Sequence, residues 1–129
     1  MKPIAIIVSG YFNPLHKGHI EYFQHAKAHG DKLFVIVNND KQREFKGSKE
    51  FMLENERVLI INELSITDKV FLSIDNERDV SLTIRKIHQE YSNHYKLIFA
   101  NGGDQNNKNI PESNICKNLG INLLGWIRI

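Results

Sequence analysis

Two histidines three residues apart are the best candidates for chemistry in this chain. His16 and His19 lie in the stretch 9–19, which reads SGYFNPLHKGH. Residues three apart are neighbours on a helical turn, so both imidazoles would face the same side of a helix that begins here. A helix N-terminus offers free N–H groups and partial positive charge, which suit a phosphate. With Gly18 leaving room between the rings, the pattern predicts a polyphosphate site, and an ordinary surface pair is the alternative.

The sequence around the histidines must place them at the end of a strand. The apolar run 4–8 precedes the stretch, and Gly10 falls where that strand must end and turn. Asn13 and Pro14 together favour an extended or turn conformation and block an early helix. These elements in this order favour the functional interpretation over the surface pair.

Short apolar runs alternate with longer mixed segments along the whole chain. Runs that are apolar on both faces are typical of parallel strands covered by helices. The sequence predicts strands at 4–8, 33–37, 70–74, 97–100 and 121–124, and helices at 18–29, 52–64, 79–91 and 111–118. We expect an α/β fold with a three-layer, doubly wound, five-stranded parallel sheet, Rossmann-like, in the order 3-2-1-4-5. Ligands of such sheets bind where the first and fourth strands lie side by side.

Three of the helices have ends or faces that can be predicted. In helix 18–29 we expect Ile20, Phe23 and Ala26 to face the core, with Gly30 as the stop. Helix 79–91 carries a clean apolar stripe, and helix 111–118 opens at a proline and ends before Gly120.

Length and charge limit the function classes. The 129 residues predict one domain, 1–129, and the net charge of +2 is too small to indicate nucleic acid as a main partner. The apolar run 4–8 is too short for a signal peptide or a membrane span, so we expect a cytoplasmic protein without a membrane partner. Cys116 is the only cysteine, so it forms no intramolecular disulfide, and a small buried side chain fits it better than a catalytic thiol.

Two polar loops should emerge at the same sheet edge as the histidines. Loop 38–50 is basic, and a mobile Lys46 or Lys49 there could close over a triphosphate, with a solvated basic loop as the alternative. In loop 101–110, Gly102, Gly103 and Asp104 follow a strand that we expect to be buried. The glycines allow close backbone approach to a base or ribose, and Asp104 could bind ribose hydroxyls or a metal, with a plain turn as the alternative.

Arg57 lies within helix 52–64 among acidic residues, so it either reaches phosphate or pairs with those neighbours. No Ser or Cys lies in a recognisable nucleophile elbow, and no Cys/His cluster has zinc spacing. The best chemical interpretation is displacement at an α-phosphate, in which an acceptor phosphate attacks and pyrophosphate leaves. A divalent ion would normally shield the triphosphate.

The stretch 10–19, GYFNPLHKGH, resembles the signature of the HxGH nucleotidylyltransferase superfamily. Residues 4–125 are similar to its small cytidylyltransferases, of the glycerol-3-phosphate kind. The resemblance implies that His16 and His19 stabilise the pentavalent α-phosphate. It also implies that the backbone at Gly10, Tyr11 and Phe12 cradles the nucleotide.

Further implications concern the loops and the assembly. Lys46 matches the mobile loop lysine of the family, Arg57 matches a functional arginine in the next helix, and Asp104 after Gly102 and Gly103 matches the segment near base and ribose. The resemblance also implies homodimers and Mg²⁺. Family members usually continue past the fifth strand into a Ser/Thr-rich segment that binds the triphosphate, whereas this sequence ends at Ile129. Either the sequence is shortened, or other loops hold the nucleotide.

The function expected from this resemblance is transfer of CMP from CTP to a small phosphorylated acceptor. The product would be a CDP-linked precursor for a surface polymer or a lipid head group. The Phe-Asn-Pro variant also occurs among related adenylyltransferases, so ATP is an alternative to CTP. A nucleotide-binding module without turnover is a second alternative.

Overall fold

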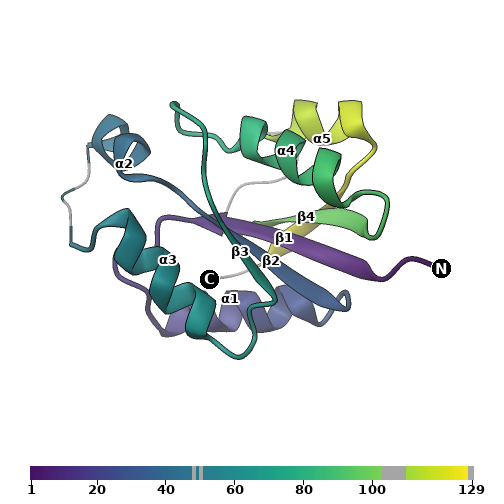
Figure 1. The fold of residues 1–129 in the computed structure, drawn as a ribbon, viewed down its shortest axis with the longest axis horizontal. Coiled ribbons are helices and arrows are strands. Elements are labelled where there is room, and N and C mark those ends of the chain that lie inside the picture. The colour runs from purple at the N-terminus through teal and green to yellow at the C-terminus, as the bar shows by residue number, and fades with distance from the viewer. Residues whose placement is uncertain (48, 50, 103–109, 128–129) are drawn as a thin grey trace.

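A computed structural model describes residues 1–47, 49, 51–102 and 110–127 of the chain. Strands and helices alternate along it (Figure 1). In order they are β1 (Ile4–Gly10), α1 (Lys17–Lys27), β2 (Lys32–Val37), α2 (Asp40–Lys46), α3 (Glu54–Glu63), β3 (Lys69–Leu72), α4 (Ser81–Tyr91), β4 (Lys96–Gly102), α5 (Ser113–Leu119) and β5 (Asn122–Ile127).

The five strands form one parallel sheet in the order β3-β2-β1-β4-β5, which confirms the predicted topology. β1 lies at the centre because its side chains are apolar on both faces. Its register joins Gly10 to Val37 of β2 and Ile7 to Phe99 of β4. The Asn38 N–H donates to the Gly10 carbonyl at 2.9 Å, so the carboxyl ends of β1 and β2 meet where the histidine stretch begins.

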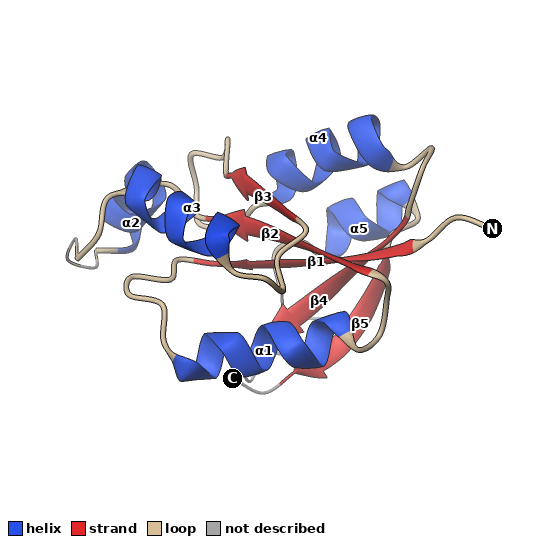
Figure 2. Cartoon of the chain, turned by 60° about the horizontal axis from the view of Figure 1, so that its bottom comes forward, coloured by secondary structure: helices blue, strands red, loops and turns tan. Residues whose placement is uncertain are grey.

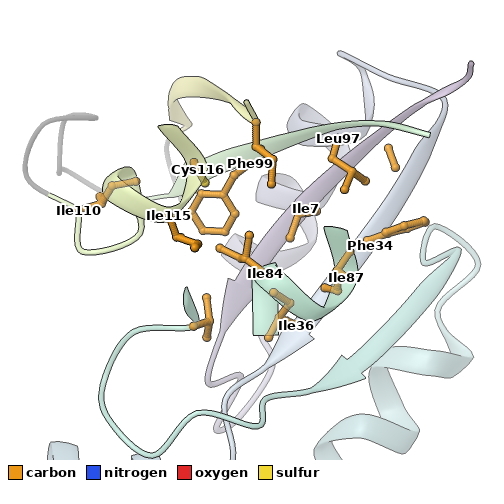
Figure 3. Close-up of a cluster of buried hydrophobic side chains, with 13 residues drawn as sticks. Ile7, Phe34, Ile36, Ile84, Ile87, Leu97, Phe99, Ile110, Ile115 and Cys116 are labelled. Atoms are coloured by element: carbon orange, nitrogen blue, oxygen red, sulfur yellow. The ribbon is translucent and has the colours of Figure 1, made fainter. Parts of the chain in front are cut away.

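Two apolar clusters fill the spaces between the sheet and its helices. α4 and α5 cover one face, and α1 and α3 cover the other (Figures 1 and 2). Alternate residues of β1 divide between the clusters, with Ala5 and Ile7 in one and Ile6 and Val8 in the other. Figure 3 shows the first cluster, where Ile84 and Ile87 of α4 belong with strand side chains. The sheet is therefore the middle layer of three, as predicted.

Helix α1 differs in two details from its prediction. Phe23 and Ala26 are buried as expected, but Ile20 is half-buried and Tyr22 takes its place in the core. The Tyr22 hydroxyl donates to the Ala100 carbonyl at 2.9 Å, which satisfies its polar end. Gly30 does not end the helix with a left-handed turn. A Cβ there would lie 2.9 Å from Ile6 Cγ1, so close packing on β1 requires this glycine.

The prediction that residues 38–50 form a flexible loop was wrong, because α2 occupies most of that segment. Asn39 is its N-cap and accepts from Gln42 N at 2.8 Å, while Gln42 Oε1 accepts from Asn39 N at 2.9 Å. This reciprocal pair is a capping box, which starts a helix by satisfying its free N–H groups. Gly47 ends the helix with φ of 84°.

The other helices and Cys116 follow the predictions closely. α4 buries Ile84 and Ile87 on one face, and Gly120 ends α5 in the left-handed conformation. Cys116 is buried, and burial first and Glu112 second raise the pKa of its thiol to about 12. Within the described ranges, none of the helices is both long and apolar enough to cross a membrane.

Candidate active site

The rings of the two histidines both accept backbone hydrogen bonds at the start of helix α1. His16 is the N-cap, and its Nδ1 accepts from the Gly18 N–H at 3.0 Å. His19 Nδ1 in turn accepts from the His16 N–H at 3.1 Å. The rings lie with centroids 3.8 Å apart. Because each Nδ1 accepts a hydrogen bond, we assign the ring proton to Nε2, so each imidazole keeps one N–H donor outside this turn.

Burial lowers the pKa of His19 to about 4, and the neighbouring His16 acts in the same direction. His19 is therefore a neutral imidazole at neutral pH. A neutral ring can donate a hydrogen bond to developing negative charge without changing its own protonation state. Two N–H donors at this position can stabilise an oxyanion; that His16 and His19 do so stays a prediction.

Phe12 holds the histidine pair against the body of the fold. Its side chain is 2% exposed, and its backbone adopts a positive φ of 54°. The ring meets His19 edge-on at 5.0 Å and Phe23 at 5.4 Å between centroids. A Cβ on Gly10 would lie 2.8 Å from Phe12 Cε1 and Cζ, so this glycine is needed for the ring to fit. A nucleotide contact by the backbone of these two residues stays a prediction.

Asn13 connects the histidine turn, which is residues 16–19, to the segment before α3. Its Nδ2 donates to the Lys49 carbonyl at 2.8 Å. Its Oδ1 accepts from the Phe51 N–H at 3.0 Å and the Met52 N–H at 2.8 Å. The side-chain amide of this one residue thus binds three backbone groups that lie more than thirty residues further along the sequence.

Arg57 is buried and joins the segments of the site, and it does not pair with its acidic neighbours on α3 as one of the two sequence expectations had it. Its side chain is 1% exposed, and its ion-pair partner is Asp40 of α2 at 2.8 Å rather than a neighbour on α3. It also donates to the carbonyls of Met52 at 3.1 Å, Tyr11 at 2.8 Å and Asn38 at 2.6 Å. Four donors of the guanidinium therefore bind groups of the protein itself and hold the site segments together, and contact of Arg57 with phosphate stays a prediction.

The N-termini of α2 and α3 are joined by a reciprocal pair of hydrogen bonds. Asp40 N donates to Glu54 Oε1 at 2.8 Å, and Glu54 N donates to Asp40 Oδ2 at 3.1 Å. Carboxylates suit these positions because helix N-termini carry partial positive charge. Tyr11 adds a contact to α2, with its hydroxyl 3.4 Å from the Gln42 carbonyl. Burial raises the pKa of Tyr11, and the nearby Arg78 and Arg57 oppose that rise.

The remaining predicted residues are only partly described. Gly18 lies in the first turn of α1, and Gly102 ends β4 at the same sheet edge. Lys46 is the last residue of α2, but its side chain lies outside the described part of the structure. Gly103 and Asp104 also lie outside the described residues. Among the residues that are described, no three His, Cys, Asp or Glu side chains gather to form a metal site.

Sequence reasoning missed a polar network at the start of α4. The buried Asp75 carboxylate accepts from the N–H groups of Leu82 at 2.8 Å and Thr83 at 3.0 Å. Glu112 Oε2 accepts from the Val80 N–H at 3.1 Å, and burial is the main reason that the pKa of this carboxyl is raised. No short spacing links these residues, so nothing local in the sequence could have revealed the network.

The cytidylyltransferase-like family model matches residues 7–118 of the chain. An FAD synthase of Picrophilus torridus is 30% identical over 92% of this chain and 79% of the relative, and one of Methanosarcina barkeri is 34% identical over 92% and 80%. The bifunctional protein HldE of Wolinella succinogenes is 32% identical over 87% of this chain and 22% of its own length.

Among solved structures, a lipopolysaccharide core biosynthesis protein from Thermoplasma volcanium is similar over 98% of this chain and 96% of its own. Its TM-score is 0.75 at 28% identity. A bifunctional NMN adenylyltransferase/ADP ribose pyrophosphatase from Francisella tularensis shares the fold, with a TM-score of 0.58 at 14% identity over 98% of this chain and 37% of that one. The histidine turn, the sheet order and these likenesses agree, and the chain belongs to the cytidylyltransferase-like family of HxGH nucleotidylyltransferases.

Proposed function

We propose that this nucleotidyltransferase is an adenylyltransferase, which moves AMP from ATP to a phosphorylated acceptor and releases pyrophosphate. The observation that carries the choice of ATP is the likeness to FAD synthases at 30% and 34% identity over 92% of the chain. FAD is FMN joined to AMP through a pyrophosphate, so FMN is the acceptor to test first. This support favours the ATP alternative over the CTP expected from the motif.

In the proposed reaction, a phosphate oxygen of the acceptor attacks the α-phosphorus of ATP. A new P–O bond forms, the bond from the α-phosphorus to the bridging oxygen breaks, and pyrophosphate leaves with the electron pair. Negative charge grows on the non-bridging α-oxygens. The Nε2–H groups of His16 and His19 are assigned to those oxygens, since neither is used within the described turn. The N-terminus of α1 adds partial positive charge at the same place.

The other site residues are proposed to position the nucleotide. The backbone from Gly10 to Phe12, with Gly18, would cradle the phosphates, and the turn 102–104 would face base and ribose. Lys46 at the end of α2 would neutralise charge on the leaving phosphates. Mg²⁺ would arrive with the triphosphate, whose oxygens it prefers, and no described side chain is assigned to it. The homodimer implied by the resemblance remains part of the proposal, and light scattering on the purified chain tests it.

The experiment is pyrophosphate release with each of the four nucleoside triphosphates against FMN and a panel of aliphatic phosphates. We expect turnover with ATP and FMN. Preference for CTP would overturn the choice of ATP. Binding of nucleotide without turnover for any pair would favour the binding module. The matched control is the double variant His16→Ala, His19→Ala, which should keep its circular dichroism spectrum and lose pyrophosphate release.

A further inference from the structure

A cavity lies at the sheet edge opposite the histidine turn. Its volume is about 530 Å³, and its floor includes Ile4, Leu97 and Ile121, near the amino ends of β1, β4 and β5. β1 runs from this cavity to Gly10, a span of about 20 Å at the usual strand rise. In Figures 1 and 2 the N-terminus leaves β1 on the side away from α2. The cavity is therefore separate from the nucleotide site.

The lining of this cavity combines an apolar floor with a cationic rim. Lys2, His88 and Lys96 are its side chains with nitrogen bases or ammonium groups, and no Asp or Glu lines it. Tyr95, whose ring also packs on Phe34, is another of its lining residues. Pockets for small organic ligands are commonly of this size, mostly apolar with a few polar groups that fix orientation. The lining thus matches a molecule with an apolar body and a negative group.

Contacts with helix ends account for one of the two lysines but not for the other. Lys2 Nζ donates to the Ser92 carbonyl at 2.9 Å, so Lys2 serves the C-terminal end of α4. Lys96 has no such task, since it forms no ion pair within the described part of the chain. The end of α5 beside it is already closed by the Ile121 N–H, which donates to the Cys116 carbonyl at 2.8 Å. Lys96 is exposed and therefore lies at the rim of the apolar cavity, where no lining residue is acidic.

We propose that this cavity binds a small organic anion whose apolar ring rests on the floor and whose carboxylate or phosphate pairs with Lys96. A ring would contact Leu97 and Tyr95, and the negative group would lie at the rim near Lys2. The site is independent of the proposed transferase activity, because none of its lining residues belongs to the histidine turn.

The first test uses anilinonaphthalene sulfonate, a fluorescent anion with an apolar ring, titrated into the folded chain. We expect one saturable site. Lys96→Glu should weaken binding by about tenfold or more, the loss typical of a hydrogen bond to a charged group. The matched control is Lys117→Glu, which makes the same change of net charge on exposed α5 outside the lining. An equal loss in both variants would mean that only net charge matters and would overturn the proposal.

A second measurement distinguishes the negative group and keeps the proposal testable if Lys96→Glu misfolds. Naphthoate, naphthyl phosphate and naphthalenemethanol share one ring and differ in charge, so each is used to displace the fluorescent probe from the unmodified chain. Displacement by either anion, with the neutral alcohol at least tenfold weaker, supports the site. Equal displacement by all three, or binding beyond one equivalent, overturns it.

Discussion

The start of α1 and the segment from α2 to α3 both shape the candidate site, but they are held in different ways. The histidine turn is fixed by hydrogen bonds within four residues, since the His16 ring accepts from the Gly18 N–H and the His19 ring accepts from the His16 N–H. The second segment is fixed by bonds that cross the chain, from Asn13 to Met52 and from Arg57 to Tyr11. The turn can therefore form with its own helix, whereas the second segment needs the assembled sheet.

This difference separates two kinds of variant. Changes within the histidine turn should affect chemistry more than stability, because few distant groups depend on them. Changes at the long-range contacts should affect both, because each removes partners from several segments at once.

Arg57→Ala should have the largest effect. It would remove the buried guanidinium that pairs with the half-buried Asp40 carboxylate and donates to three backbone carbonyls. Removing one member of a buried ion pair typically costs about 3–5 kcal/mol of unfolding free energy. Urea unfolding measures it, and Arg85→Ala on the exposed side of α4 is the control. A loss below about 1 kcal/mol would show that this junction does not hold the segments together.

His16→Ala and His19→Ala should each lower turnover by about 10²-fold or more, as loss of an oxyanion donor does. The accompanying loss of unfolding free energy should be only about 0.5–2 kcal/mol, the usual value for a helix cap. Pyrophosphate release and urea unfolding give the two numbers. His25→Ala, exposed on the same helix, should change neither. Near-normal turnover in either variant would remove that ring from the proposed mechanism.

Asn13→Ala should show an intermediate effect on both quantities. It leaves the N–H groups of Phe51 and Met52 without an acceptor, which typically costs about 1–3 kcal/mol. We expect KM for the triphosphate to rise while kcat falls less than in the histidine variants. Asn13→Asp keeps the acceptor oxygen and loses only the donor to Lys49, so it should recover part of the loss. Equal behaviour of the two variants would contradict the bridging role.

The pH dependence should show the smallest effect. Because the pKa of His19 is lowered to about 4 from an ordinary value near 6.5, the unfolded chain binds more protons between these values. Stability from this residue is complete above the unfolded pKa and is lost as pH falls toward 4. Thermal unfolding at pH 7 and pH 5 should therefore differ more for the unmodified chain than for His19→Gln. His25→Gln, made at an exposed histidine, should leave the difference unchanged.

The sequence was most informative where structure depends on local pattern. Strand positions and the stripe of α4 follow from apolar periodicity, which burial enforces. The sheet order was expected because alternating strands and helices favour a doubly wound sheet with the first and fourth strands side by side. The pairing of His16 with His19 follows from helical spacing alone. The missed α2 helix also had a local signal, since Asn39 and Gln42 stand at capping-box spacing.

The long-range contacts could not be predicted from one sequence. Arg57 looked like a phosphate ligand or the partner of its own neighbours, and only the assembled sheet brings Tyr11 and Asn38 to it. Asn13 looked like a turn residue whose amide had no evident partner. The choice between ATP and CTP is likewise absent from the histidine turn, because the proposed partner of that turn is the α-phosphate, which both nucleotides share.

The single thiol of the chain can report on local opening of the fold around it. Cys116 is fully buried between α5 and the sheet, and the pKa of its thiol is raised to about 12. Thiol reagents react with the thiolate, so labelling has to wait for α5 to separate from β4 and β5. The rate of labelling would measure how often α5 separates, without any engineered probe. Added nucleotide should slow the labelling only if its binding at α1 makes the packing of α5 on β4 and β5 more rigid.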